Sequence, residues 1–387
     1  MRSRLWPLYA GGLLGPFGGA MVTTMLPELA TGLHTSLATA ASSLTVYLVP
    51  FAAIMLVSGT LAEHWGRART IRWAYVVYAL ASVLCALAPS AATFLSARAV
   101  QGAANAFTTP LLVAAISDLV GPTRLGRSLG VFGGMQAAGQ AFAPLVGGMA
   151  AALDYRWAFV AAAAAAALLG AVPPADHASA PGDDATPGLF DAARWRSLAN
   201  RRLALACSVA FGLYLTTSGL NLLSALLAHD RFDLGPDRRG LVVAAFGVAG
   251  LLTGPRFGRL ADRVGMRPFG VVVSLVFAAV VAATAYTPSV ALLVVAVAAG
   301  GAASTAGRLT STTLAVTSTP GNRAGATSMT LAWQFLGSAL APVSLLPLYH
   351  RSVGWGFAAT ACGAVLAAAL LAGAPGLNRT LRRSAAR

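Results

Sequence analysis

Two short stretches of the chain repeat each other: residues 59–67 read Gly59-Thr-Leu-Ala-Glu63-His-Trp-Gly66-Arg67, and residues 258–267 read Gly258-Arg-Leu-Ala-Asp262-Arg-Val-Gly265-Met-Arg267. Both contain a glycine, a leucine, a carboxylate, a second glycine and an arginine in the same order, and each lies between two long apolar runs. A loop that recurs at matching places indicates an internal repeat, in which two halves of the chain fold alike.

The composition is that of a membrane protein. Of the 387 residues, 57% are hydrophobic and 10% are charged, and the mean hydropathy is +0.71, whereas soluble domains carry roughly 25% charged residues. Runs of about 20 apolar residues cross a bilayer as helices. We therefore predict an all-α membrane protein with 12 transmembrane helices, near residues 5–28, 42–62, 71–88, 92–117, 128–151, 156–172, 202–228, 238–257, 268–286, 289–317, 324–349 and 353–373.

The longest polar interval separates six predicted helices from six others. It is rich in proline, glycine and aspartate and reads as a linker. We expect an N-terminal six-helix bundle over residues 1–172, a cytoplasmic linker over 173–201, and a C-terminal bundle with a short cytoplasmic tail over 202–387.

The net charge of +15 follows the predicted membrane topology. All 27 basic residues are arginines; if the N-terminus is cytoplasmic, 20 of them fall on cytoplasmic segments, five on the opposite side, and Arg98 and Arg308 within helices. An excess of basic residues marks cytoplasmic loops. This pattern predicts a multi-pass protein of a bacterial inner membrane with both termini in the cytoplasm, and it accounts for the charge without nucleic acid.

The repeated loop resembles the loop motif G-x-L-a-D-r-x-G-r of the major facilitator superfamily, and the resemblance extends over essentially the whole chain. It implies two pseudo-symmetric bundles and a conformational latch, in which an arginine of the loop pairs with an acid of a neighbouring helix. Asp118 is the candidate partner of Arg67. The chain departs from the motif at Glu63, where aspartate is usual, and at Ala68, where a base is usual. The predicted latch residues are Gly59, Glu63, Gly66, Arg67, Asp118, Gly258, Asp262, Gly265 and Arg267.

A second match to this family is Arg98-Ala-Val-Gln101-Gly102, similar to its R-x-x-Q-G element. The resemblance implies that Arg98 takes part in proton coupling and that Gln101 positions it. An arginine inside an apolar helix normally faces the bundle interior and finds a partner. The alternative is that Arg98 lies near a helix end and extends its head group to the membrane interface.

Residues 139–148 read Gly139-Gln-Ala-Phe-Ala-Pro144-Leu-Val-Gly147-Gly148. They resemble the antiporter motif G-x-x-x-G-P-x-x-G-G of the same family, with alanine in one glycine place. The resemblance implies drug:proton antiport. The alternative is a glycine-rich packing face of an ordinary helix.

Polar and aromatic residues within predicted helices are candidates for a substrate cavity: Tyr47, Asn105, Gln136, Gln140, Asn221, Arg308, Trp333 and Gln334. None of the 12 acidic residues falls in the middle of a predicted helix. A cavity that contains arginine without a carboxylate favours neutral or anionic substrates over cations.

These features together predict a secondary transporter for proton-coupled efflux of small lipophilic compounds, such as antibiotics or secondary metabolites, by alternating access. The alternative is proton-coupled uptake of a sugar or an organic acid. The five histidines lie at predicted loops or helix ends and do not form a catalytic cluster, so we expect neither an enzyme nor a bound cofactor or metal. The expected partners are a small-molecule substrate, protons and the lipid bilayer, and we expect a monomer.

Overall fold

The computed structural model describes residues 2–120, 122–172, 196, 198–319 and 322–374. The described residues are almost entirely helical and include no strand. The chain divides into two compact units, Met1–Ala192 and Ala193–Arg387. Most of the predicted linker, residues 173–195 and 197, and the predicted tail beyond residue 374 lie outside the described residues.

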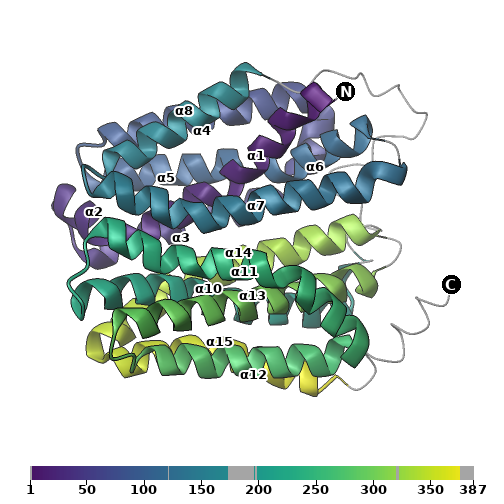
Figure 1. Ribbon diagram of the computed structural model, residues 1–387. Coiled ribbons are helices and arrows are strands. Elements are labelled where there is room, and N and C mark those ends of the chain that lie inside the picture. The colour runs from purple at the N-terminus through teal and green to yellow at the C-terminus, as the bar shows by residue number, and fades with distance from the viewer. Residues whose placement is uncertain (1, 121, 173–195, 197, 320–321, 375–387) are drawn as a thin grey trace. The chain divides into compact units, whose positions relative to one another are not determined.

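The helices of the first unit lie side by side along a common direction (Figure 1). Its closest helix pairs are α4 with α8, α1 with α7, α3 with α5, and α4 with α5. In chain order its elements are α1 (Arg2–Ala20), the 3-10 helix η1 (Met21–Thr24), α2 (Leu26–Gly32), α3 (Leu37–Trp65), α4 (Arg67–Leu87), α5 (Ala91–Asn105), α6 (Thr108–Leu119), α7 (Pro122–Ala151) and α8 (Arg156–Ala171).

The second unit repeats this arrangement with fewer interruptions. Its closest pairs are α10 with α14, α11 with α13, and α12 with α15. Its elements are α10 (Arg201–Asp230), α11 (Pro236–Val264), α12 (Met266–Thr284), α13 (Val290–Ser318), α14 (Arg323–Arg351) and α15 (Val353–Ala372).

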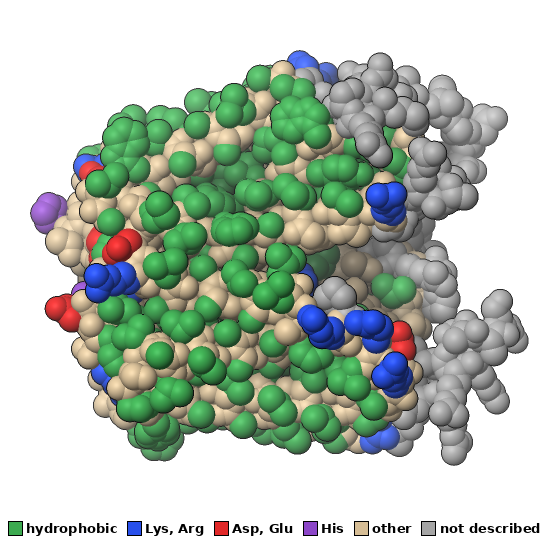
Figure 2. Space-filling model, viewed as in Figure 1, with side chains coloured by type: hydrophobic (Ala, Val, Ile, Leu, Met, Phe, Trp, Pro, Cys, Tyr) green, Lys and Arg blue, Asp and Glu red, His purple; other side chains and the backbone are tan. Residues whose placement is uncertain are grey.

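Eight of the described segments are individually long and apolar enough to cross a membrane, and a bent pair within α11 makes a ninth. The segment α8 is apolar but shorter. With α7, and with α1, η1 and α2 counted as one broken segment, the described helices match the twelve predicted ones. Figure 2 shows hydrophobic side chains over the middle of the helices and charged ones toward their ends, as a protein surrounded by lipid requires.

Two helices predicted as continuous are broken. The predicted helix 5–28 becomes α1, η1 and α2, and the predicted helix 92–117 becomes α5 and α6. At the second break the Thr108 hydroxyl donates to the Asn105 carbonyl and carboxamide oxygens at 2.8 Å. Such local bonds compete with the helix hydrogen bonds, and apolar periodicity does not report them.

Internal symmetry extends from the loops into the packing of the helices. A Cβ atom at Gly102 of α5 would lie 2.0 Å from the Tyr47 carbonyl oxygen of α3, and one at Gly301 of α13 would lie 1.9 Å from the Phe246 carbonyl oxygen of α11. Both glycines and both aromatic residues are 199 positions apart. Backbones can approach this closely only where a side chain is missing.

The loop glycines follow the same repeat. Gly66 and Gly265, again 199 positions apart, have φ angles of 85° and 90° and precede the first residues of α4 and α12. Residues with a Cβ rarely adopt positive φ. Helices α5 and α13 start after matching serines, Ser90 and Ser289, whose hydroxyls accept from backbone N–H groups three residues later.

Candidate functional site

The interior of the first unit contains a buried cation. Arg98 of α5 is 0% exposed, so its head group does not extend to the membrane interface. Its Nη1 donates to the Gly18 carbonyl of α1 at 3.0 Å and to Gln101 Oε1. Gln101 Nε2 in turn donates to Ser82 Oγ of α4 at 2.7 Å. The Arg98 guanidinium also lies over the Tyr47 ring, 4.2 Å from its centroid, a favourable cation–π geometry. We call Arg98, Gln101, Ser82 and Tyr47 the arginine cluster.

The charge of the cluster is not neutralised within the described part of the chain. No described carboxylate forms an ion pair with Arg98, and its Nε and Nη2 atoms are buried without a hydrogen-bond partner. Burial of a charge without a counter-ion costs several kcal/mol. The N–H groups of these two donor atoms therefore have no acceptor within the described part of the chain.

Asn105 continues the cluster by one turn toward the break between α5 and α6. Its Nδ2 donates to the Gly15 carbonyl at 2.7 Å and to the Tyr47 hydroxyl at 2.6 Å. A Cβ atom at Gly18 would meet the hydroxyl of Tyr78 at 2.3 Å and that of Tyr47 at 2.8 Å. Helices α1, α3, α4 and α5 thus meet at one polar centre.

The matching centre of the second unit is mostly apolar. At the constant spacing of 199 positions, the counterparts of Arg98, Gln101 and Ser82 are Val297, Gly300 and Val281, and the counterparts of Tyr47 and Tyr78 are Phe246 and Phe277. Ser304 takes the place of Asn105 and hydrogen bonds to Thr217 at 2.7 Å. The backbone repeat is therefore retained while the buried charge occurs in only one copy.

The predicted antiporter motif lies along the contact between α7 and the first segment. A Cβ atom at Gly139 would lie 2.2 Å from the Leu13 carbonyl oxygen, and one at Gly147 would lie 2.1 Å from that of Met21. The Thr24 hydroxyl donates to the Pro144 carbonyl at 2.9 Å. Gly148 is buried. These contacts hold α7 directly against the backbone of α1 and η1.

Helix α14 has a glycine and a proline at the positions that match Gly139 and Pro144 of α7, but not the glycine pair. Gly337 packs on the Phe211 carbonyl oxygen as Gly139 packs on that of Leu13, and Pro342 lies 198 positions after Pro144. Leu345 and Leu346 replace the glycine pair. Of these two helices, only α7 therefore has two glycines on the turn that follows the proline.

The two loop arginines have different partners. Arg67 forms an ion pair with Asp118 at the end of α6, and both side chains are partly exposed. Arg267 instead donates to the carbonyl oxygens of Leu371, at 3.1 Å, and Ala372. The expected acid is replaced by the C-terminal carbonyls of α15, whose partial negative charge attracts a cation.

Other predicted latch residues contribute no described side-chain contact. Only the backbones of Gly59 and Glu63, within α3, are described, and their side chains lie outside the description. Gly258 has open space around its Cα, and Asp262 is exposed.

The remaining cavity candidates are dispersed over both units. Gln136 donates to Thr109 at 3.5 Å, Gln140 is half-buried and Gln334 is buried. The Asn221 carboxamide oxygen has no described partner. Arg308 lies beside the Tyr214 hydroxyl, and the exposed Trp333 packs edge-on against Phe211 at 5.9 Å.

Sequence reasoning missed three residues of this site: Ser82, Tyr78 and Thr24. Each is a lone hydroxyl in an apolar helix, and such a pattern does not distinguish an internal hydrogen bond from a cluster. Alignment of the two halves would have drawn attention to Ser82 and Tyr78, because their counterparts Val281 and Phe277 are apolar.

The profile of the Major Facilitator Superfamily matches residues 8–342 and, in a second match, residues 215–384. The chain belongs to this superfamily. The predicted resemblance is thereby confirmed, and the chain is a multi-pass membrane protein of this superfamily.

Curated relatives are similar over part of the chain. The MFS-type transporter EfpA of Mycobacterium tuberculosis is 32% identical over 38% of this chain and 28% of its own length. The puromycin resistance protein pur8 of Streptomyces alboniger is 33% identical over 40% of this chain and 32% of its own length. The efflux pump dotC of Dothistroma septosporum is 31% identical over 36% of this chain and 24% of its own length. The chain thus spans only about a quarter to a third of the length of the curated relatives it matches.

Solved structures share the fold over nearly the full length. A bacterial homologue of the human lysosomal transporter Spinster, in an inward-facing and unoccupied conformation, matches with a TM-score of 0.76 and 16% identity, over 99% of this chain and 98% of that chain. A D-xylose–proton symporter matches with a TM-score of 0.72 and 18% identity, over 95% of this chain and 96% of that chain. At these identities the similarity establishes the major facilitator fold of the protein. It does not identify the substrate or the direction of transport.

Proposed function

We propose that this transporter exports small lipophilic compounds by proton-coupled antiport, as a monomer in a bacterial inner membrane with both termini in the cytoplasm. The observation that carries the proposal is the packing of the α7 motif, in which Gly139 and Gly147 lie against the backbone of α1 and η1. The names of the relatives, a puromycin resistance protein and an efflux pump, support export.

In this proposal the two six-helix bundles, residues 1–172 and 202–387, alternate around a shared substrate site. Arg98 and Gln101 serve proton coupling. The guanidinium stays protonated, so its role is to orient water or an acidic group through its two unoccupied donors and to repel a second positive charge. The buried cation favours neutral or anionic compounds. The proposed substrate site includes Tyr47, Asn105, Gln136, Gln140, Asn221, Arg308, Trp333 and Gln334.

Drug sensitivity tests this proposal directly. An efflux-deficient bacterial host that expresses the protein should tolerate higher concentrations of several lipophilic antibiotics, and the panel should contain puromycin. Tolerance should disappear with Arg98→Ala and in the presence of a protonophore, because each removes proton coupling. Unchanged sensitivity across the panel, or best export of a permanently cationic dye, would contradict the proposal.

The ion pair of Arg67 and Asp118 is proposed to latch one conformation. Exposed ion pairs stabilise by about 1 kcal/mol or less, so reversing one charge should change thermal stability little. We expect Arg67→Asp or Asp118→Arg alone to slow transport by a large factor, and the double reversal to restore most of it. Transport in proteoliposomes measures this, with Arg72→Asp on the same helix as the control.

A further inference from the structure

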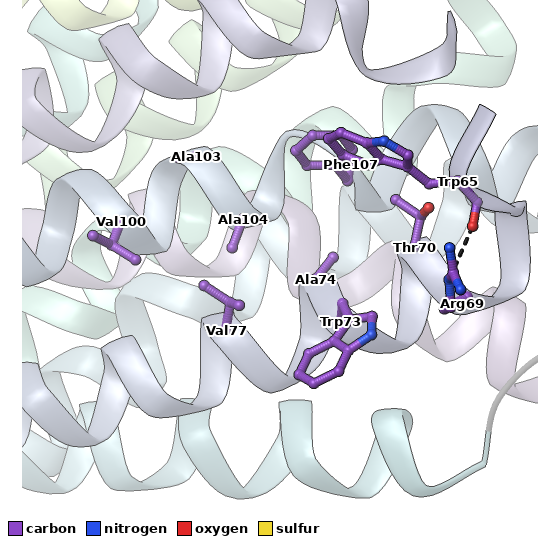
Figure 3. A pocket seen from close by; sticks show the side chains of 10 residues that line it. All are labelled: Trp65, Arg69, Thr70, Trp73, Ala74, Val77, Val100, Ala103, Ala104 and Phe107. Atoms are coloured by element: carbon purple, nitrogen blue, oxygen red, sulfur yellow. Dashed lines mark hydrogen bonds between the residues drawn. The ribbon is translucent and has the colours of Figure 1, made fainter. Parts of the chain in front are cut away.

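An apolar groove lies on the exposed side of α4 and α5, where Trp65, Trp73 and Val100 are exposed. It has a volume of about 560 Å³ and lies between α4 and α5, within the range of small-molecule sites. Figure 3 shows the lining side chains along α4 and α5, with the rings of Trp65 and Phe107 close together near the loop end. They are Trp65, Arg69, Thr70, Trp73, Ala74, Val77, Val100, Ala103, Ala104 and Phe107.

The groove exists because small residues form its floor and large ones its rim. Ala74, Ala103 and Ala104 leave space where α4 faces α5. Trp73 is 61% exposed and Val100 is 48% exposed on the rim. The lining positions of α5 recur at intervals of three and four residues, which places them on one helix face.

The ends of the groove differ in polarity. Arg69 lies at the loop end near Trp65, and its Nε donates to the Trp65 carbonyl at 3.0 Å, whereas Val77 and Val100 lie at the other end (Figure 3). In the described contacts this bond uses Nε alone, and the Arg69 side chain is exposed. From Arg69 to Val77 the helix rises about 12 Å, which is most of one leaflet's hydrocarbon depth.

We infer that the groove binds an anionic phospholipid of the leaflet next to the α3–α4 loop, with one acyl chain between α4 and α5 and the phosphate at Arg69. The charge at one end and the apolar lining over the remaining length are complementary to a lipid with a negative head group. Tryptophans prefer the interface between head groups and hydrocarbon, and Trp65 and Trp73 lie four residues before and after Arg69. The inference does not depend on the direction of transport.

Native mass spectrometry of the full-length protein tests this inference. Delipidated protein should bind phosphatidylglycerol more tightly than phosphatidylcholine with the same acyl chains, by about fivefold for one arginine near a phosphate. Arg69→Gln should remove this preference, and the control Arg72→Gln on the same helix should retain it. Ala103→Trp fills the groove and should lower binding of both lipids, while Ala164→Trp on the exposed face of α8 should not.

Three results would overturn the inference. The first is equal binding of both lipids by the unaltered protein. The second is an equal loss of preference in Arg69→Gln and Arg72→Gln, which would reduce the effect to surface charge. The third is a dimer that Ala103→Trp dissociates, which would assign the groove to a second copy of the chain. The melting temperature of each variant, measured in detergent, establishes that the variants are folded.

Discussion

Gly102→Ala should destabilise the protein severely, although alanine is the better helix former. Its methyl group would lie 2.0 Å from the Tyr47 carbonyl oxygen, so α3 and α5 must separate along a contact that also positions the arginine cluster. Overpacking of this kind destabilises a protein by about 3 kcal/mol at the upper end of its usual range. For a unit of this size that corresponds to roughly 6–12 °C in apparent midpoint, measurable by thermal unfolding in detergent.

A matched substitution separates this effect from helix propensity. A Cβ atom at Gly133 of α7 would meet no atom within 4 Å, so Gly133→Ala should leave the midpoint unchanged or raise it, since alanine favours helix by about 1 kcal/mol. Gly301→Ala should behave like Gly102→Ala, because its methyl group meets the Phe246 carbonyl oxygen at 1.9 Å. Equal midpoints for Gly102→Ala and Gly133→Ala would refute the packing argument.

In contrast to Gly102→Ala, Arg98→Leu should abolish transport and leave the stability of the protein nearly unchanged. The second unit accommodates Val297 at the matching position, fully buried, so this site in the fold accepts an aliphatic side chain. Replacing a buried charge by an apolar group is often neutral or stabilising, while the freed Gln101 and Gly18 oxygens each lose a donor, at about 1–3 kcal/mol. We expect a net change within about 2 kcal/mol in either direction.

Two measurements check this expectation. Thermal unfolding gives the stability, and substrate-driven proton movement in proteoliposomes gives coupling. Arg98→Lys, which keeps the charge but not the planar fork of donors, should retain part of the activity. Normal proton movement by a folded Arg98→Leu variant would exclude Arg98 from coupling.

The sequence was sufficient to predict the family, the helical class and most helix positions, because apolar runs and a repeated loop report these directly. It also identified Asp118 as the acid that contacts Arg67. The same reasoning expected an acid for Arg267, which contacts backbone carbonyls of α15. Residue types alone do not reveal a backbone partner a hundred positions away.

The breaks at Thr23–Thr24 and at Asn105 were not predicted for a related reason. They depend on side-chain hydrogen bonds to carbonyls, and hydropathy measures transfer between solvents rather than such bonds. Likewise, the sequence shows a lone arginine, Arg98, in the middle of an apolar helix. It does not show that this side chain contacts Gly18 of α1, because that contact depends on how the helices pack.

Arg267 is hydrogen bonded to the backbone of the last turn of α15, whereas in the described contacts Arg67 pairs only with a side chain, so the two loops are held with different strength. The Arg67 pair joins two partly exposed side chains and can dissociate without disturbing any backbone, with water replacing each partner. Moving Arg267 away would leave the carbonyl oxygens of Leu371 and Ala372, at the end of α15, without this donor. In the proposed alternation of the two bundles, the Arg67–Asp118 pair should therefore separate more readily than the contacts of Arg267 with α15.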